Sequence, residues 1–345
     1  MKESTSGRTS FASWIGDHAS ALGTLGTLDF RSPVDDLEPL RDIVGPARVV
    51  ALGESSHHLR EFYQVRHRIL RFLVERCGFE VYALEAPFTQ GQVLDGWVRG
   101  GPGTVEQVAA DGIALSLGQC REMHEALTWM RELEEAVDVV RRFHDPVTFA
   151  ALGRYQALGP IERDVLTSAL SRLMAHLRRM ASVQRAHGHG ADHDTATWHL
   201  RGAWYLDQLH RANAAEGFES ASTFRDVYMA ESVLRLLEGG QRVVLAAHNW
   251  HIQRTPAMDS EENLLLPAGA HLAAALGNGY RAIGVTSSLG RTATLGEPTP
   301  ERPQGAWCDA ASFQHTRMAD YFLDMPVFDA IAHVSRTTGT DHVVR

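Results

Sequence analysis

The chain has 345 residues, of which 44% are hydrophobic and 22% are charged, and its formal net charge is −9. This composition is typical of a globular protein and argues against a disordered chain, while the length predicts one large domain or two ordinary ones. Because binding to phosphates needs concentrated positive charge, the acidic balance argues against nucleic acid as the main partner.

Lys2 is the only lysine among the 33 basic residues. Reactions that need a lysine inside the fold, such as Schiff-base formation or phosphate binding by a P-loop, are therefore excluded. The three cysteines, Cys77, Cys120 and Cys308, form no C-x-x-C pair, which indicates reduced thiols. The first residues do not resemble a signal peptide and no apolar run reaches the length of a membrane span, so we expect a cytoplasmic protein that contacts no membrane.

The first part of the chain predicts a strand, a helix and a second strand. Residues 1–45 are expected to form an N-terminal helical segment, which Pro46 ends. The apolar run at 48–53 predicts a buried strand, and hydrophobic residues at helical spacing over 61–75 predict a helix that Gly78 stops. A second strand follows at 79–84. This order is the signature of a parallel sheet with a right-handed crossover.

The rest of the chain predicts a long helical stretch and then a return to strands. The helices are expected over 127–137, 165–183, 198–209 and 227–237. Later elements are buried strands at 242–247 and 280–286, a helix around 272–276, a loop at 290–312 and a final strand at 328–334.

The predicted fold class is therefore α/β, a mostly parallel sheet with flanking helices and a large helical insertion. We expect residues 46–100 and 240–345 to form the α/β core that carries the active site. Residues 101–239 would form the helical insertion or subdomain, whose size is typical of a separate unit.

Titratable residues follow three of the four strands that build this core. Glu54 and His57 come after the first, Glu85 after the second, and His248 after the third, with His251 close behind. Ligands of an open parallel sheet lie beyond the carboxyl ends of its strands, so these side chains are expected to converge there. Since buried charges are costly unless they are paired, the set is harder to explain as helix capping than as an active site.

The residue types indicate acid–base chemistry. Imidazole titrates near neutral pH, so we expect His57 to remove a proton from water, with Glu54 or Glu85 orienting it. The groups expected to polarise a substrate carbonyl and stabilise its oxyanion are His248, His251 and Arg66.

Plainer interpretations stay open for single residues. A helix cap would explain Glu54 or Glu85 taken alone. His58 is expected to be a solvated neighbour of His57. The stretch from His187 to His193 resembles a metal-binding tract, but its glycines favour a solvated loop between two helices.

Four stretches carry a resemblance to a known family. They are Gly53-Glu-Ser-Ser-His57 with Glu61-Phe62 and Arg66-His67-Arg68, then Tyr82-Ala-Leu-Glu85-Ala, then Phe224-Arg225-Asp226-x-x-Met229-Ala230-Glu231, and finally Ala247-His248-Asn249-x-His251. In order and spacing, over roughly residues 45–335, these motifs resemble the erythromycin esterase family. Two positions depart from its pattern: His58 stands where a glycine is usual, and Ser232 where an asparagine is usual.

The resemblance implies an enzyme that hydrolyses an ester or lactone, with macrolide antibiotics as the best-known substrates. It implies a histidine base without a required metal, and we expect no cofactor. The catalytic residues of the family fall on Glu54, His57, Arg66, Glu85, His248 and His251. We expect substrate contacts from Arg225, Met229, Trp250 and Ser287, and a small-molecule natural product as the partner.

Other functions remain possible from the sequence alone. The same His–Glu site could serve natural-product biosynthesis by lactonisation, dehydration or ring closure. Two His and two Glu could bind Zn²⁺ or Mn²⁺ in a metallohydrolase. Ser55 lies between a strand and a helix, as the nucleophile of a serine hydrolase does. An inactive relative could also act as a binding module.

Overall fold

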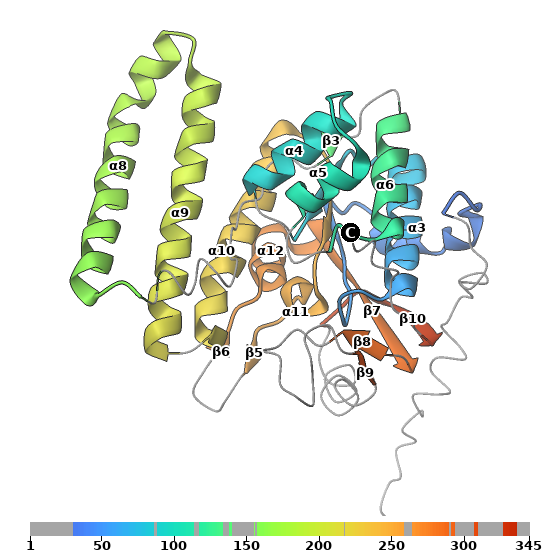
Figure 1. Ribbon diagram of the computed structural model, residues 1–345. Helices are drawn as coiled ribbons and strands as arrows, with labels where there is room; N and C mark the ends of the chain where they lie inside the picture. Colours follow the sequence, from blue (N-terminus) through green and yellow to red (C-terminus); the bar gives the residue numbers. More distant parts are fainter. Residues whose placement is uncertain are drawn as a thin grey trace, which may run out of the picture.

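The computed structural model describes residues 30–85, 88–113, 117–133, 138–139, 155, 157–216, 218–258, 264–289, 291–293, 307–309 and 327–336. Within these ranges the predicted fold class is confirmed, because a parallel sheet runs through the molecule with helices packed around it (Figure 1).

The main sheet has the strand order β10-β7-β1-β4-β2-β3, and each neighbouring pair is parallel. Its strands are β1 (Val49–Leu52), β2 (Val81–Leu84), β3 (Asp138–Val139), β4 (Val243–Ala246), β7 (Tyr280–Leu289) and β10 (Ala330–Arg336). In register, Leu52 lies opposite Ala246 and Ile283, and Leu84 also lies opposite Ala246. The residues that follow β1, β2 and β4 therefore leave the sheet at the same edge.

The sheet separates two hydrophobic layers, because successive side chains of a strand point to opposite faces. Val50 and Leu52 pack in the cluster that includes α3 (Arg60–Cys77), α5 (Val105–Gly112) and α6 (Arg121–Glu132). Val49 and Ala51 pack in the cluster that includes α10 (Phe218–Leu236) and α12 (Ala268–Leu276). Gly78 ends α3 at φ 70°, as predicted from the sequence.

The predicted helical middle of the chain has two different structural contexts. Helices α5 and α6 share the core of α3, together with α4 (Phe88–Val98), and β3 joins the main sheet beside β2. Helices α8 (Pro160–Ala186) and α9 (Gly190–Glu216) instead form a hairpin at the outer edge of the molecule (Figure 1). The division of the chain into a core and a 101–239 insertion stays a prediction.

Several shorter elements complete the described chain. The 3-10 turns are η2 (Asp35–Leu37), η3 (Leu237–Gly239) and η4 (Gly277–Gly279), and the short helices are α2 (Leu40–Val44) and α11 (Asn249–Ile252). Two antiparallel pairs join β5 (Ala257–Met258) to β6 (Leu264–Leu265) and β8 (Arg291–Ala293) to β9 (Trp307–Asp309). No helix in the described ranges is long and apolar enough to span a membrane.

Three expectations about elements need correction or fall outside the structure. The stretch 290–312 is not only loop, because it contains β8 and β9, which are too short to show a strand period. The helix expected over 127–137 ends at Glu132, since Leu133 has an extended backbone, and residues 134–137 lie outside the described residues. Residues 1–29 of the expected N-terminal segment also lie outside them.

The Asn249 side chain packs closely against Gly53 at the end of β1 and holds this edge of the sheet together. The Asn249 side chain bonds the main chain of Val285 in β7, donating from Nδ2 to the carbonyl at 2.9 Å and accepting the N–H at Oδ1 at 3.1 Å. It lies so near Gly53 that a Cβ there would be 1.9 Å from Oδ1 of Asn249 and 2.9 Å from Ile252 Cδ1. Glycine at position 53 therefore makes room for α11.

Gly53→Ala is expected to lower the free energy of unfolding by about 2 kcal/mol or more, because the added methyl forces Asn249 and α11 to move. Gly96→Ala is the matched control, since a Cβ at this exposed position of α4 meets nothing within 4 Å. It should raise the free energy of unfolding by roughly 0.5–1 kcal/mol, as alanine favours helix. Urea denaturation measures both, and a Gly53→Ala protein as stable as the wild type would contradict the close approach.

Candidate active site

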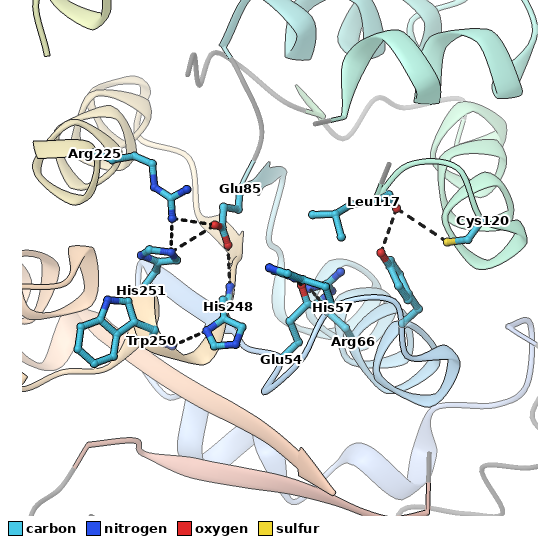
Figure 2. Close-up of polar contacts among 11 residues, drawn as sticks. Glu54, His57, Arg66, Glu85, Leu117, Cys120, Arg225, His248, Trp250 and His251 are labelled. Atoms are coloured by element: carbon cyan, nitrogen blue, oxygen red, sulfur yellow. Dashed lines mark hydrogen bonds and ion pairs between the residues drawn. The ribbon is translucent and has the colours of Figure 1, made fainter. Parts of the chain in front are cut away.

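Side chains from three loops meet at the carboxyl edge of the sheet. Glu54 and His57 follow β1, Glu85 follows β2, and His248 and His251 follow β4, so they come from three adjacent strands. Figure 2 shows one group around Glu54 and another around Glu85, with His248 between them. The rings of His57 and His248 have centroids 5.4 Å apart, and Glu85 Oε2 accepts the backbone N–H of His248 at 2.8 Å.

The first group consists of Glu54, His57 and Arg66. Glu54 is only 2% exposed; its Oε1 accepts a hydrogen bond from His57 Nδ1 at 2.9 Å, and its Oε2 lies 3.3 Å from Arg66 Nη1. Burial raises the pKa of Glu54, but the charge of Arg66 and the contact with His57 outweigh it and lower the pKa to about 2. The carboxylate is therefore ionised at neutral pH, with Arg66 held against it.

The bond to Glu54 fixes the tautomer of His57. A carboxylate only accepts hydrogen bonds, so Nδ1 carries a proton and Nε2 is the nitrogen that can take one up. Burial lowers the pKa of His57, but the hydrogen bond to Glu54 and its charge, followed by the charge of Glu85, raise it above 6.5 overall.

His248 is held as a neutral ring. It caps the start of α11, where its Nδ1 accepts the backbone N–H of Trp250 at 3.2 Å. Burial, and then the charge of His57, lower the pKa of His248 to about 4. At neutral pH the ring is therefore neutral with its proton on Nε2, which makes that nitrogen a hydrogen-bond donor.

The second group surrounds Glu85. Its Oε1 accepts a hydrogen bond from Arg225 Nη2 at 3.0 Å and lies 3.3 Å from His251 Nε2, and the Arg225 guanidinium also contacts that nitrogen. On its other side, His251 Nδ1 donates to Asp226 Oδ1 at 2.7 Å. Burial raises the pKa of Glu85, but His251 and Arg225 bring it well below its usual range.

The remaining predicted substrate contacts lie in different surroundings. Arg225 is part of the Glu85 group, and Trp250 is half-buried on α11. Met229 packs in the hydrophobic cluster between α10 and the sheet, and Ser287 is a buried residue of β7 opposite Val334. Their roles toward a substrate stay predictions.

The expectation that His58 is solvated is wrong. Its side chain is 3% exposed, and its φ of 61° places the backbone in the left-handed region, the only such angle for a non-glycine residue in the described chain. The sharp turn from β1 into α3 directs the side chain inward. Glycine adopts this conformation without strain, which agrees with the glycine usual in the resembling family.

The histidine-rich stretch from His187 to His193 contains only a short turn, because its second half already belongs to α9. His187 follows the last turn of α8, and α9 already begins at Gly190. His193 is buried in the first turn of α9, where Nε2 bonds the carbonyl of Leu177 at 2.8 Å. The parts of the chain that the structure describes contain no group of three His, Cys, Asp or Glu residues that could hold a metal ion.

Two residues of the site were not singled out from the sequence. Asp226 is buried against His251, and Asn249 ties the loop of His248 and His251 to β7. Both lie inside the resembling motifs, next to residues that were named. Their position there was the available signal, because neither residue follows a strand directly.

Comparison with known proteins gives a consistent result. A sequence profile described as erythromycin esterase matches residues 74–150 and 133–342. Erythromycin esterase type II from Escherichia coli is 32% identical over 316 residues, covering 76% of this chain and 74% of the relative. Erythromycin esterase type I from Escherichia coli is 24% identical over 345 residues, covering 86% and 84%.

Solved structures share the fold. A Bacillus cereus protein matches with a TM-score of 0.73 at 18% identity, covering 97% of this chain and 98% of the other. A variant of the erythromycin esterase EreC in its open conformation matches with a TM-score of 0.67 at 22% identity, covering 83% and 80%. The profile matches residues 74–150 and 133–342, and the type II esterase covers 76% of this chain at 32% identity; on this basis the chain belongs to the erythromycin esterase family.

Proposed function

We propose that the protein hydrolyses an ester bond in a macrolide-like lactone, with His57 as the general base. The observation that carries the proposal is the pairing of His57 with the buried Glu54, whose 2.9 Å bond directs the proton-accepting nitrogen away from the carboxylate. The names of the two curated relatives, erythromycin esterases, support the choice of substrate class.

The proposed reaction begins with water. His57 Nε2 takes one proton from a water molecule while the oxygen attacks the carbonyl carbon of the ester. The imidazolium that forms is stabilised by Glu54, which accepts the Nδ1 proton in a hydrogen bond. His57 then returns the proton to the departing alkoxide, so the lactone and water give one carboxylic acid and one alcohol.

The negative charge that develops on the carbonyl oxygen needs a donor. His248 suits this role because its Nδ1 accepts the N–H of Trp250, so the proton of the neutral ring is on Nε2 and can be donated in a hydrogen bond to the oxyanion. Arg66 was expected at the oxyanion, but it lies against the far oxygen of Glu54. We assign Arg66 to keeping Glu54 ionised.

His57→Ala is expected to lower kcat/KM for erythromycin by at least ~10², because it removes the base. The matched control is His189→Ala, which removes an exposed histidine beyond the end of α8 and should leave turnover near the wild-type value. Mass spectrometry of the ring-opened product measures both. Near-normal turnover of His57→Ala would remove this residue from the chemistry.

Hydrolysis in ¹⁸O-labelled water is expected to place one solvent oxygen in the product carboxylate, since water is the nucleophile. A screen of macrolide lactones and simple esters, followed by mass spectrometry, checks this. A product without the label would instead indicate lactonisation, dehydration or ring closure by the same acid–base pair.

The pH profile should report His57. Because only the unprotonated ring accepts a proton and its pKa is raised, kcat/KM should rise with pH through a midpoint above 6.5. Glu54→Gln removes the charge that raises this pKa while burial still lowers it, so the midpoint should move to lower pH and the plateau should fall. Profiles of the two proteins that coincide after scaling would contradict the assigned base.

A further inference from the structure

Asp226 is a buried carboxylate that the proposed reaction does not use. It lies on α10 beside Arg225 and is 1% exposed. Its Oδ1 accepts the Nδ1–H of His251 at 2.7 Å and also the backbone N–H of Ala268, the first residue of α12, at 3.3 Å. A carboxylate buried to this degree is costly unless it is compensated, and His251 is the titratable group placed to do so.

Polar contacts connect His251, through Glu85, to the backbone of His248. His251 presents Nδ1 to Asp226 and Nε2 to Glu85 Oε1, at 3.3 Å, so one ring lies between two carboxylates. Glu85 Oε2 in turn accepts the backbone N–H of His248 at 2.8 Å. Asp226, His251 and Glu85 therefore form one chain of polar contacts that ends at the main chain of His248.

We propose that Asp226 is a positioning residue for the reaction, which orients His251 so that Glu85 stays fixed against the backbone of His248. The proposal rests on the function proposed above, in which His248 donates to the carbonyl oxygen. Asp226 does not touch the reacting atoms in this scheme, and its effect passes through His251 and Glu85.

The charges around His251 support this role. Asp226 and Arg225 face it from α10, Glu85 from the end of β2, and His248 from its own loop, while α12 contributes the backbone N–H of Ala268. With His251 protonated, two carboxylates balance two cations, Arg225 and His251. Burial and the charge of Arg225, whose guanidinium contacts Nε2, lower the pKa of His251, but Asp226 and Glu85 outweigh them and raise it to about 9.

Asp226→Asn tests the role with little change in shape, because an asparagine oxygen can still accept from His251 and Ala268. The pKa of His251, followed by NMR of protein with ¹⁵N-labelled histidine and assigned with His251→Gln, should fall from about 9 to below 7. kcat for erythromycin should fall by about 10-fold to 100-fold, the range found when a group that orients a metal-binding histidine is lost, while KM changes less. Asp226→Glu restores the charge and should recover part of kcat and keep the pKa above 7.

The matched control is Asp207→Asn. Asp207 on α9 is also a buried carboxylate, 3% exposed, and it accepts hydrogen bonds from the hydroxyls of Tyr155 at 2.6 Å and of Thr167 on α8 at 2.5 Å. Its variant should change stability but neither the titration of His251 nor kcat.

Outcomes separate the two proposals. The positioning role is overturned if Asp226→Asn keeps both the wild-type kcat and the wild-type pKa of His251, even when the protein is an active esterase. If Asp226→Asn does not fold, titration of the wild type decides, and a His251 that titrates below 7 overturns the role. If no lactone is hydrolysed, the proposed function fails, while the NMR titration still tests the contact between Asp226 and His251.

Discussion

The arrangement of the site depends on one side chain, the amide of Asn249. It satisfies both the N–H and the carbonyl of Val285 in β7, as the backbone of a neighbouring strand would. The backbone N–H of Asn249 also donates to the carbonyl of Glu54 at 2.8 Å. The loop after β4 is thereby tied to the residues that follow β1 and to β7. His248 and His251 lie on either side of this fixed residue in the sequence.

The same edge keeps two neighbouring imidazoles in different charge states, one neutral and one positive. His248, which faces His57 and caps a short helix, has its pKa lowered to about 4, whereas His251, between two carboxylates, has its pKa raised to about 9. The difference comes from the partners and not from burial, which lowers the pKa of both rings. The proposed reaction uses this separation, with His248 as a neutral donor and His251 as the charged partner of Glu85.

The sequence predicted the core of the fold and the meeting of the site loops, because both follow from local patterns. Apolar runs predict the strands β1, β2, β4 and β7, and parallel pairing then brings the residues after β1, β2 and β4 to one edge. The side chains that contact those residues could not be predicted in the same way. Asp226 reaches His251 from a helix 25 positions earlier, and such side-chain pairs leave no trace in hydrophobic periodicity. The burial of His58 depends on a single positive φ angle, which composition does not reveal.

Helix α8 differs from the other long helices in how little of its surface is buried. None of its 27 residues is buried, and Ile161, Val165 and Leu173 are exposed apolar side chains on it. A helix that buries so little adds little to the cooperative core, so most substitutions along its outer face should be nearly neutral for folding. For protein engineering, this outer helix is consequently the convenient place to attach a dye, an affinity handle or a surface tether while the chemistry at the sheet proceeds undisturbed.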